Sequence, residues 1–120
     1  MTNLSELAGV ANNDGGFTYN PMGDFFPSSG FAVGIFKNKE KRIASPILST
    51  EHLAEFVEFV EDQLRVPGCC IGGWLVAGIW YLDVSVLMPT FESAIELAKE
   101  HDQIAIYNLS THETIYLKNL

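Results

Sequence analysis

The sequence predicts an α+β domain of the ferredoxin-like class, with two helices on one face of an antiparallel sheet and an extra C-terminal strand. Three observations support this prediction. Apolar residues recur at helical spacing in two segments, they alternate in several others, and the segments follow one another as β-α-β-β-α-β. The length of 120 residues fits one domain.

The first predicted strand is Phe31–Phe36, whose odd-numbered residues share one apolar face. We expect a basic turn at residues 37–42. Residues 43–48 extend the strand system, but only at an edge or in a loop, because Pro46 cannot donate a hydrogen bond to a central ladder.

The first predicted helix is capped by Ser49 or Thr50 and runs to about Leu64. Residues 66–68 (Val-Pro-Gly) end it. Its apolar residues fall three, one, three and four positions apart, which places them on one side of a helix: Leu53, Phe56, Val57, Val60 and Leu64.

Two predicted strands at residues 69–76 and 79–88 are joined by a tight turn at Ala77-Gly78. The second strand alternates clearly. We expect its even-numbered residues, from Trp80 to Met88, to face the core, and Asp83 to lie on the exposed face.

The second predicted helix begins at Pro89-Thr90 and runs to about His101. Strands at residues 103–109 and 113–117 follow it, with a turn between them. The chain thus ends in a hairpin added to the core pattern.

Residues 1–30 are predicted to form a partly irregular N-terminal arm, and residues 31–120 a single α+β domain. The first dozen residues form one weak helical turn or a frayed end. The aromatic residues of the segment 17–30 indicate that it lies on the body of the fold. The open face of the sheet is then either covered by this arm or free as an interaction surface.

The charge balance argues against direct binding of nucleic acid. The chain has 15 Asp and Glu against 7 Lys and Arg, a formal net charge of −8, whereas phosphate binding depends on Lys and Arg. The longest apolar stretch, residues 68–82, is shorter than the roughly 20 residues that a membrane-spanning helix needs. We therefore expect a cytoplasmic protein that does not enter a membrane.

No residue pattern indicates catalysis, a metal or a cofactor. Cys69 and Cys70 are adjacent, and the interpretation we favour is a pair of structural thiols. His52, His101 and His112 are scattered without ligand spacing. We assign no catalytic residue, no metal ligand and no cofactor.

Several segments carry a resemblance to known proteins. They are Gly16–Val33, Ile71–Trp74 followed by Tyr81–Ser85, and Ala94–Ala98 with Gln103–Tyr107. Over about residues 15–118 the chain resembles a group of small uncharacterised proteins encoded by actinobacterial phages, prophages and plasmids. The group has no assigned activity, so the resemblance implies only a mobile element that acts inside a bacterial cell. The apolar turn region at residues 75–80 departs from the polar turn common in that group.

Acidic residues gather on the predicted helices. Those of the first helix are spaced by four, three and four residues, so they form a stripe opposite the apolar one. Two interpretations remain open: a solvated helix face, or a negative surface that docks on a basic groove as a phosphate mimic. The candidate partner-binding residues, continued on the second helix, are Glu51, Glu55, Glu58, Asp62, Glu92 and Glu96.

Trp74 and Tyr81 are candidate interface aromatics, most simply for a homodimer. The sequence thus predicts a non-enzymatic, mobile-element-encoded interaction protein. In this prediction it is an acidic inhibitor or modulator of a host defence or nucleic-acid-handling protein, or it binds an element-encoded protein. The alternative is a self-associating structural or accessory protein.

Overall fold

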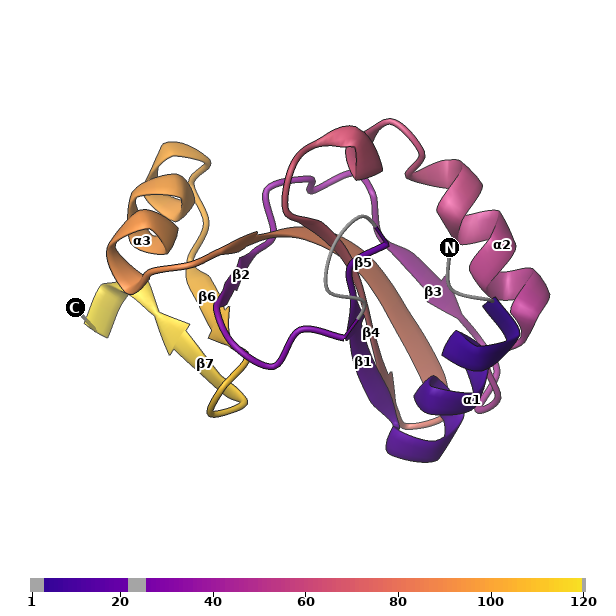
Figure 1. Cartoon of the computed structure of the whole chain (residues 1–120). Coiled ribbons are helices and arrows are strands. Elements are labelled where there is room, and N and C mark those ends of the chain that lie inside the picture. Colours follow the sequence, from indigo (N-terminus) through magenta and orange to yellow (C-terminus); the bar gives the residue numbers. More distant parts are fainter. Residues whose placement is uncertain (1–3, 22–25, 120) are drawn as a thin grey trace.

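The computed structural model describes residues 4–21 and 26–119, and within them the chain forms three α-helices and one antiparallel sheet of seven strands (Figure 1). The helices are α1 (Leu4–Asp14), α2 (Thr50–Phe59) and α3 (Phe91–Glu100), with 3-10 turns η1 (Gln63–Arg65) and η2 (Leu117–Asn119). The strands are β1 (Gly16–Tyr19), β2 (Phe31–Val33), β3 (Lys41–Ile43), β4 (Cys69–Val76), β5 (Ile79–Met88), β6 (Ala105–Asn108) and β7 (Glu113–Tyr116).

The sheet is organised around β5. Its strand order is β1-β4-β5-β2-β6-β7, and β3 also pairs with β5. One edge of β5 pairs with β4 throughout. The other edge is shared, because β3 pairs with Trp80–Leu82 and β2 pairs with Val86–Met88. Residues 83–85 therefore have no partner on that edge among the described strands.

The α+β class and the antiparallel sheet are confirmed. The ferredoxin-like topology is not, because the strand order differs: β1 extends the sheet beyond β4, and β3 shares the edge of β5 with β2. Neither strand has a strong sequence signal. β1 lies within the predicted arm, and β3 begins in the predicted basic turn at residues 37–42.

The central hairpin agrees with the sequence. The strands at residues 69–76 and 79–88 have the predicted bounds. Ala77 and Gly78 have φ values of 51° and 78°, as a two-residue hairpin turn requires. The remaining strands are shorter than predicted, since β2 ends at Val33, β6 spans Ala105–Asn108 and β7 ends at Tyr116.

Capping side chains define where α2 and α3 begin. The Ser49 hydroxyl accepts the His52 N–H at 3.1 Å, and Thr90 does the same for Ser93 at 3.1 Å. The end of α2 differs from the prediction, because the helix stops at Phe59 rather than near Leu64. There the Lys39 ammonium donates to the Phe59 carbonyl at 3.3 Å, which suits the negative C-terminal end of a helix.

The N-terminal segment is more ordered than predicted. Where the sequence indicates one weak turn or a frayed end, the structure has the 11-residue helix α1, with Leu7, Ala8 and Ala11 buried. The Asn12 side chain accepts from the Leu48 N–H and donates to the Leu48 carbonyl, both at 2.8 Å. This helix therefore packs into the main core.

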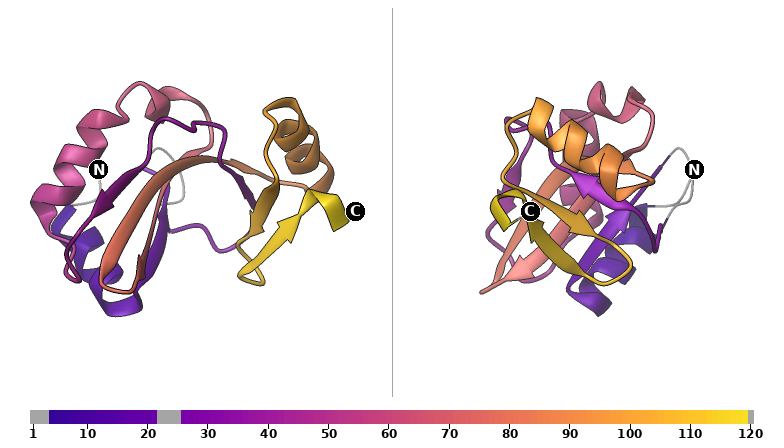
Figure 2. Two further views of the ribbon diagram at one scale, coloured as in Figure 1. Left: turned by 180° about the vertical axis from the view of Figure 1, so that it is seen from behind. Right: turned by 90° about the vertical axis from the view of Figure 1, so that its left-hand side faces the viewer.

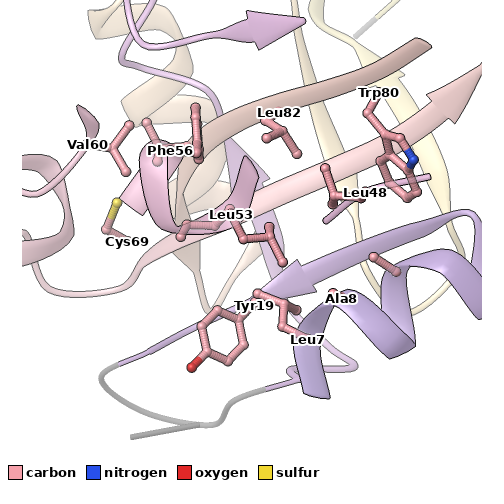
Figure 3. Close-up of a cluster of buried hydrophobic side chains, with 13 residues drawn as sticks. Leu7, Ala8, Tyr19, Leu48, Leu53, Phe56, Val60, Cys69, Trp80 and Leu82 are labelled. Carbon is pink, nitrogen blue, oxygen red and sulfur yellow. The ribbon is translucent and has the colours of Figure 1, made fainter. Parts of the chain in front are cut away.

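Two hydrophobic cores lie on the same face of the sheet. The larger one joins α1 and α2 to β1, β4 and β5, and side chains such as Tyr19, Phe56 and Trp80 converge there (Figure 3). The smaller one joins α3 to β2 and β6 through Val33 and Ile106. Figure 2 shows α3 at one end of the molecule and α1 with α2 at the other.

Candidate functional site: the open face of the sheet

The face of the sheet opposite the helices carries a groove of about 810 Å³. Strands β1, β4 and β5 contribute one side of it, and β6, β7 and residues 27–28 contribute the other. None of the three described helices packs on this face, since their apolar side chains meet the alternate residues of β4 and β5. No described helix therefore covers the groove, although Cys70 and Ser85 on the same face are buried.

Two adjacent glycines of β4 leave room for side chains on opposite faces of the sheet. Gly72 lies directly across from Asp83, and a Cβ at Gly72 would lie only 2.6 Å from the Asp83 Oδ1 atom. A Cβ at Gly73 would instead collide with the Phe17 ring on the helical side. The missing side chain of Gly72 is what lets the Asp83 carboxylate lean across the strand within the groove.

Asp83 is a carboxylate held among protein atoms yet accessible to solvent. It is exposed in the middle of β5, as the alternation of that strand predicts. Desolvation by the surrounding groove raises its pKa from 3.8 to about 6, and the negative charge of Glu40 adds to this effect. No ion pair joins Asp83 to a Lys, Arg or His among residues 4–21 and 26–119.

Asp83 also lines a second cavity of about 280 Å³. This cavity lies where β3 and β2 separate along the edge of β5, and Val84 forms part of its wall. Its charged lining residues are Lys37, Glu40 and Asp102. The carboxylate can therefore be approached from both sides of the strand.

The candidate interface aromatics lie together on the open face. Trp74 and Tyr81 are direct cross-strand neighbours, with ring centroids 6.2 Å apart and ring planes at 70°. Trp74 is 60 % exposed. The Arg42 guanidinium lies 5.3 Å from the centroid of the Tyr81 ring, so the pair already holds one cation from its own chain.

The far wall of the groove adds polar groups. Tyr107, on β6, and His112, in the turn before β7, are joined by a contact of 3.3 Å between the hydroxyl and Nδ1. Sequence reasoning did not select Asp83, Gly72, Tyr107 or His112 as site residues. The alternation of β5 predicts that Asp83 lies on the exposed face of the sheet. The positions of Gly72, Tyr107 and His112 in the groove depend on strand register and sheet curvature, which the sequence pattern does not show.

The acidic candidates do not form one surface. Glu51, Glu55, Glu58 and Asp62 are exposed on α2 and just beyond it. Glu92 and Glu96 are exposed on α3, which lies at the other end of the molecule (Figure 2). The only ion pairs of the described residues join Arg65 to Glu61 at 3.9 Å and to Asp62 at 3.7 Å. The stripe on α2 therefore stands alone, away from the groove.

The two cysteines lie in the interior. Burial raises the pKa of the Cys69 thiol to about 11 and that of Cys70 to about 12, so both stay protonated at neutral pH. The described part of the chain brings no three His, Cys, Asp or Glu side chains together in a way that would hold a metal ion. None of its helices has the length and apolar character that crossing a bilayer requires.

Comparison of the chain with protein-family models, with curated proteins and with solved structures finds no match.

Proposed function

We propose that this protein acts by binding a partner protein on the open face of its sheet, without catalysing a reaction. The observation that carries the proposal is the aromatic pair beside the groove. Trp74 keeps 60 % of its surface exposed, although burying such a side chain is strongly favourable. Large exposed aromatics next to a concave surface are typical of protein interfaces.

The acidic stripe on α2, defined as Glu51, Glu55, Glu58 and Asp62, has a supporting role in this proposal. Its carboxylates are exposed, so the surrounding water weakens any single ion pair they form. Their summed field, with a net charge of −8 on the chain, attracts a basic partner over a longer range. The stripe therefore accelerates association, while the groove provides the contact.

The proposal also specifies the kind of cell in which the protein works. The resemblance to phage, prophage and plasmid proteins supports a role in the cytoplasm of a bacterial host, where the partner is a host or element-encoded protein. A basic, nucleic-acid-handling or defence protein fits the negative charge. The chain would then work as an inhibitor or modulator.

Affinity capture tests the proposal. The wild-type chain, Trp74→Ala and Ile47→Ala serve as baits in the same host lysate. Ile47 is the matched control, because it is 62 % exposed but does not line the groove. We expect a protein held by wild type and Ile47→Ala to be lost with Trp74→Ala, since removal of a central aromatic costs about 2 kcal/mol or more.

Two results would contradict the binding proposal. Equal recovery by all three baits would show that the open face is not the contact. Recovery of the chain alone, with a concentration-dependent dimer that Trp74→Ala converts to monomer, would favour the self-association alternative. That alternative is supported by the exposed apolar side chains Trp74, Val76 and Tyr116 on the strands.

A further inference from the structure

We infer that the groove recognises an arginine side chain of the partner protein, with its guanidinium between the Asp83 carboxylate and the Trp74 ring. This inference rests on the proposed function, because it names the chemical group that the open face binds. It follows from the charge of the groove, from the spacing of Asp83 and Trp74, and from a contact that the chain already makes with its own arginine.

The groove needs a cation to balance its charge. Asp83 has no ion-pair partner among the described residues, and Asp14 also lines the groove, whose described lining includes no Lys or Arg. In the smaller cavity, Glu40 and Asp102 outnumber Lys37. An anionic ligand would meet this negative field, whereas a cation would be held by it.

The spacing of the two contact groups suits a flat cation. Gly72 and Trp74 are two residues apart on β4, and their cross-strand partners are Asp83 and Tyr81. The two pairs therefore follow one another on the same face, about 7 Å apart along the strands. Because Gly72 has no side chain, the Asp83 carboxylate lies across this position, on the same face of β4 as the exposed Trp74 ring.

The chain itself shows that this aromatic pair accepts a guanidinium. Arg42 lies over the Tyr81 ring at 5.3 Å, and Trp74 packs edge-to-face against that ring. Arg42 is directly opposite Tyr81 in the pairing of β3 with β5. A second guanidinium on the Trp74 side would stack in the same way and donate paired hydrogen bonds to Asp83, which the ammonium of lysine cannot do.

Among the described strands, none pairs with residues 83–85 on that edge of β5, which makes the Asp83 carboxylate more accessible. Because β2 and β3 separate there, Asp83 faces the smaller cavity as well as the groove. The donors of a bound guanidinium can therefore reach the carboxylate without displacing a strand.

The test uses small probes, so that it does not depend on the partner. Nα-acetyl-arginine amide, its neutral analogue with citrulline and its lysine analogue are titrated into the ¹⁵N-labelled chain at low salt and about pH 7.5. We expect the arginine probe to shift the amide signals of Gly72, Asp83 and Val84 and the indole signal of Trp74. The citrulline probe should leave them unchanged, and the lysine probe should bind about tenfold more weakly.

Variants separate Asp83 from the general acidity of the chain. Asp83→Asn keeps the shape and removes the charge, and should weaken arginine binding about tenfold or more. Asp62→Asn makes the same change on the acidic stripe and should have no effect. Preserved dispersion of the ¹⁵N spectrum confirms that each variant is folded.

The pH dependence gives a second readout. Arginine affinity should fall as the pH drops through the Asp83 pKa of about 6, because the protonated acid no longer attracts the cation. Asp83→Asn keeps the other charged or ionisable side chains that line the groove and the smaller cavity, namely Asp14, Lys37, Glu40, Asp102 and His112. The pH profile of this variant therefore measures the contribution of these groups, and subtracting it from the wild-type profile should leave a loss of affinity centred near pH 6.

Equal binding of arginine and citrulline, equal binding of arginine and lysine, or an unchanged affinity in Asp83→Asn would overturn the inference. These outcomes leave the proposed function standing if Trp74→Ala still loses the captured partner while Ile47→Ala retains it. Arginine binding without a Trp74-dependent partner would instead support the site and contradict the partner-binding function.

Discussion

At the scale of single residues, the open face depends on what is missing from β4. Gly72 has no side chain, so the carboxylate opposite it occupies that space and stays accessible. Gly73 also has no side chain, which leaves room for the Phe17 ring on the helical side of the sheet. One glycine pair therefore fits an aromatic ring on one face and a carboxylate on the other.

Asp83 should reduce stability at neutral pH. Its folded-state pKa of about 6 lies above the ordinary value of 3.8, so the folded state binds the proton more tightly than the unfolded chain does. The resulting stabilisation is fully present below about pH 4 and is lost as the pH rises through about 6.

Asp83→Asn removes this dependence. We expect the urea midpoint of the variant to exceed that of wild type above about pH 6, with the difference shrinking towards about pH 4. Carboxylates remote from Asp83 contribute equally in both chains and cancel in the difference; Glu40 is the exception, because its charge interacts with that of Asp83. A difference between the two midpoints that is the same at every pH would contradict the raised pKa.

At the scale of elements, the strength of the local signal decides what the sequence can predict. The hairpin of β4 and β5 has strict alternation and a Gly-containing turn, and both its strands agree with the prediction. The helix α1 has no continuous stripe of large apolar residues that would predict it. Its formation depends on the burial of Leu7 and Ala11 and on the hydrogen bonds between Asn12 and Leu48. Such tertiary contacts are invisible to periodicity.

The acidic stripe should control the rate of association more than its final strength. Changing Glu51, Glu55 and Glu58 to Lys should slow binding of the captured partner about tenfold at low salt, with little change in dissociation. The matched control is the same change at Glu92, Glu96 and Glu100 of α3, which should have a smaller effect. Stopped-flow measurements at two salt concentrations test this, and a salt-independent rate equal in all three proteins would refute it.

At the scale of the whole molecule, the site is a consequence of sheet curvature. The first part of β5 packs in the core with α1 and α2, and its last part packs in the core with α3. Along one edge of β5 the paired strand changes from β3 to β2. The groove on the opposite face is lined by residues from both ends of the chain. The sequence predicts the exposed face of Asp83, but not the groove, because strand register and twist bring its walls together.

The exposure of Trp74 in the complex tests the central claim most directly. The chain is labelled with 5-fluorotryptophan, and Trp74→Phe assigns the two ¹⁹F signals. In the free chain the signal of Trp74, 60 % exposed, should shift between H₂O and D₂O, whereas that of the buried Trp80 should not. With the captured partner bound, we predict that the solvent shift of Trp74 disappears and that Trp80 is unchanged. A Trp74 signal that keeps its full solvent shift in the complex would contradict the open face as the binding surface.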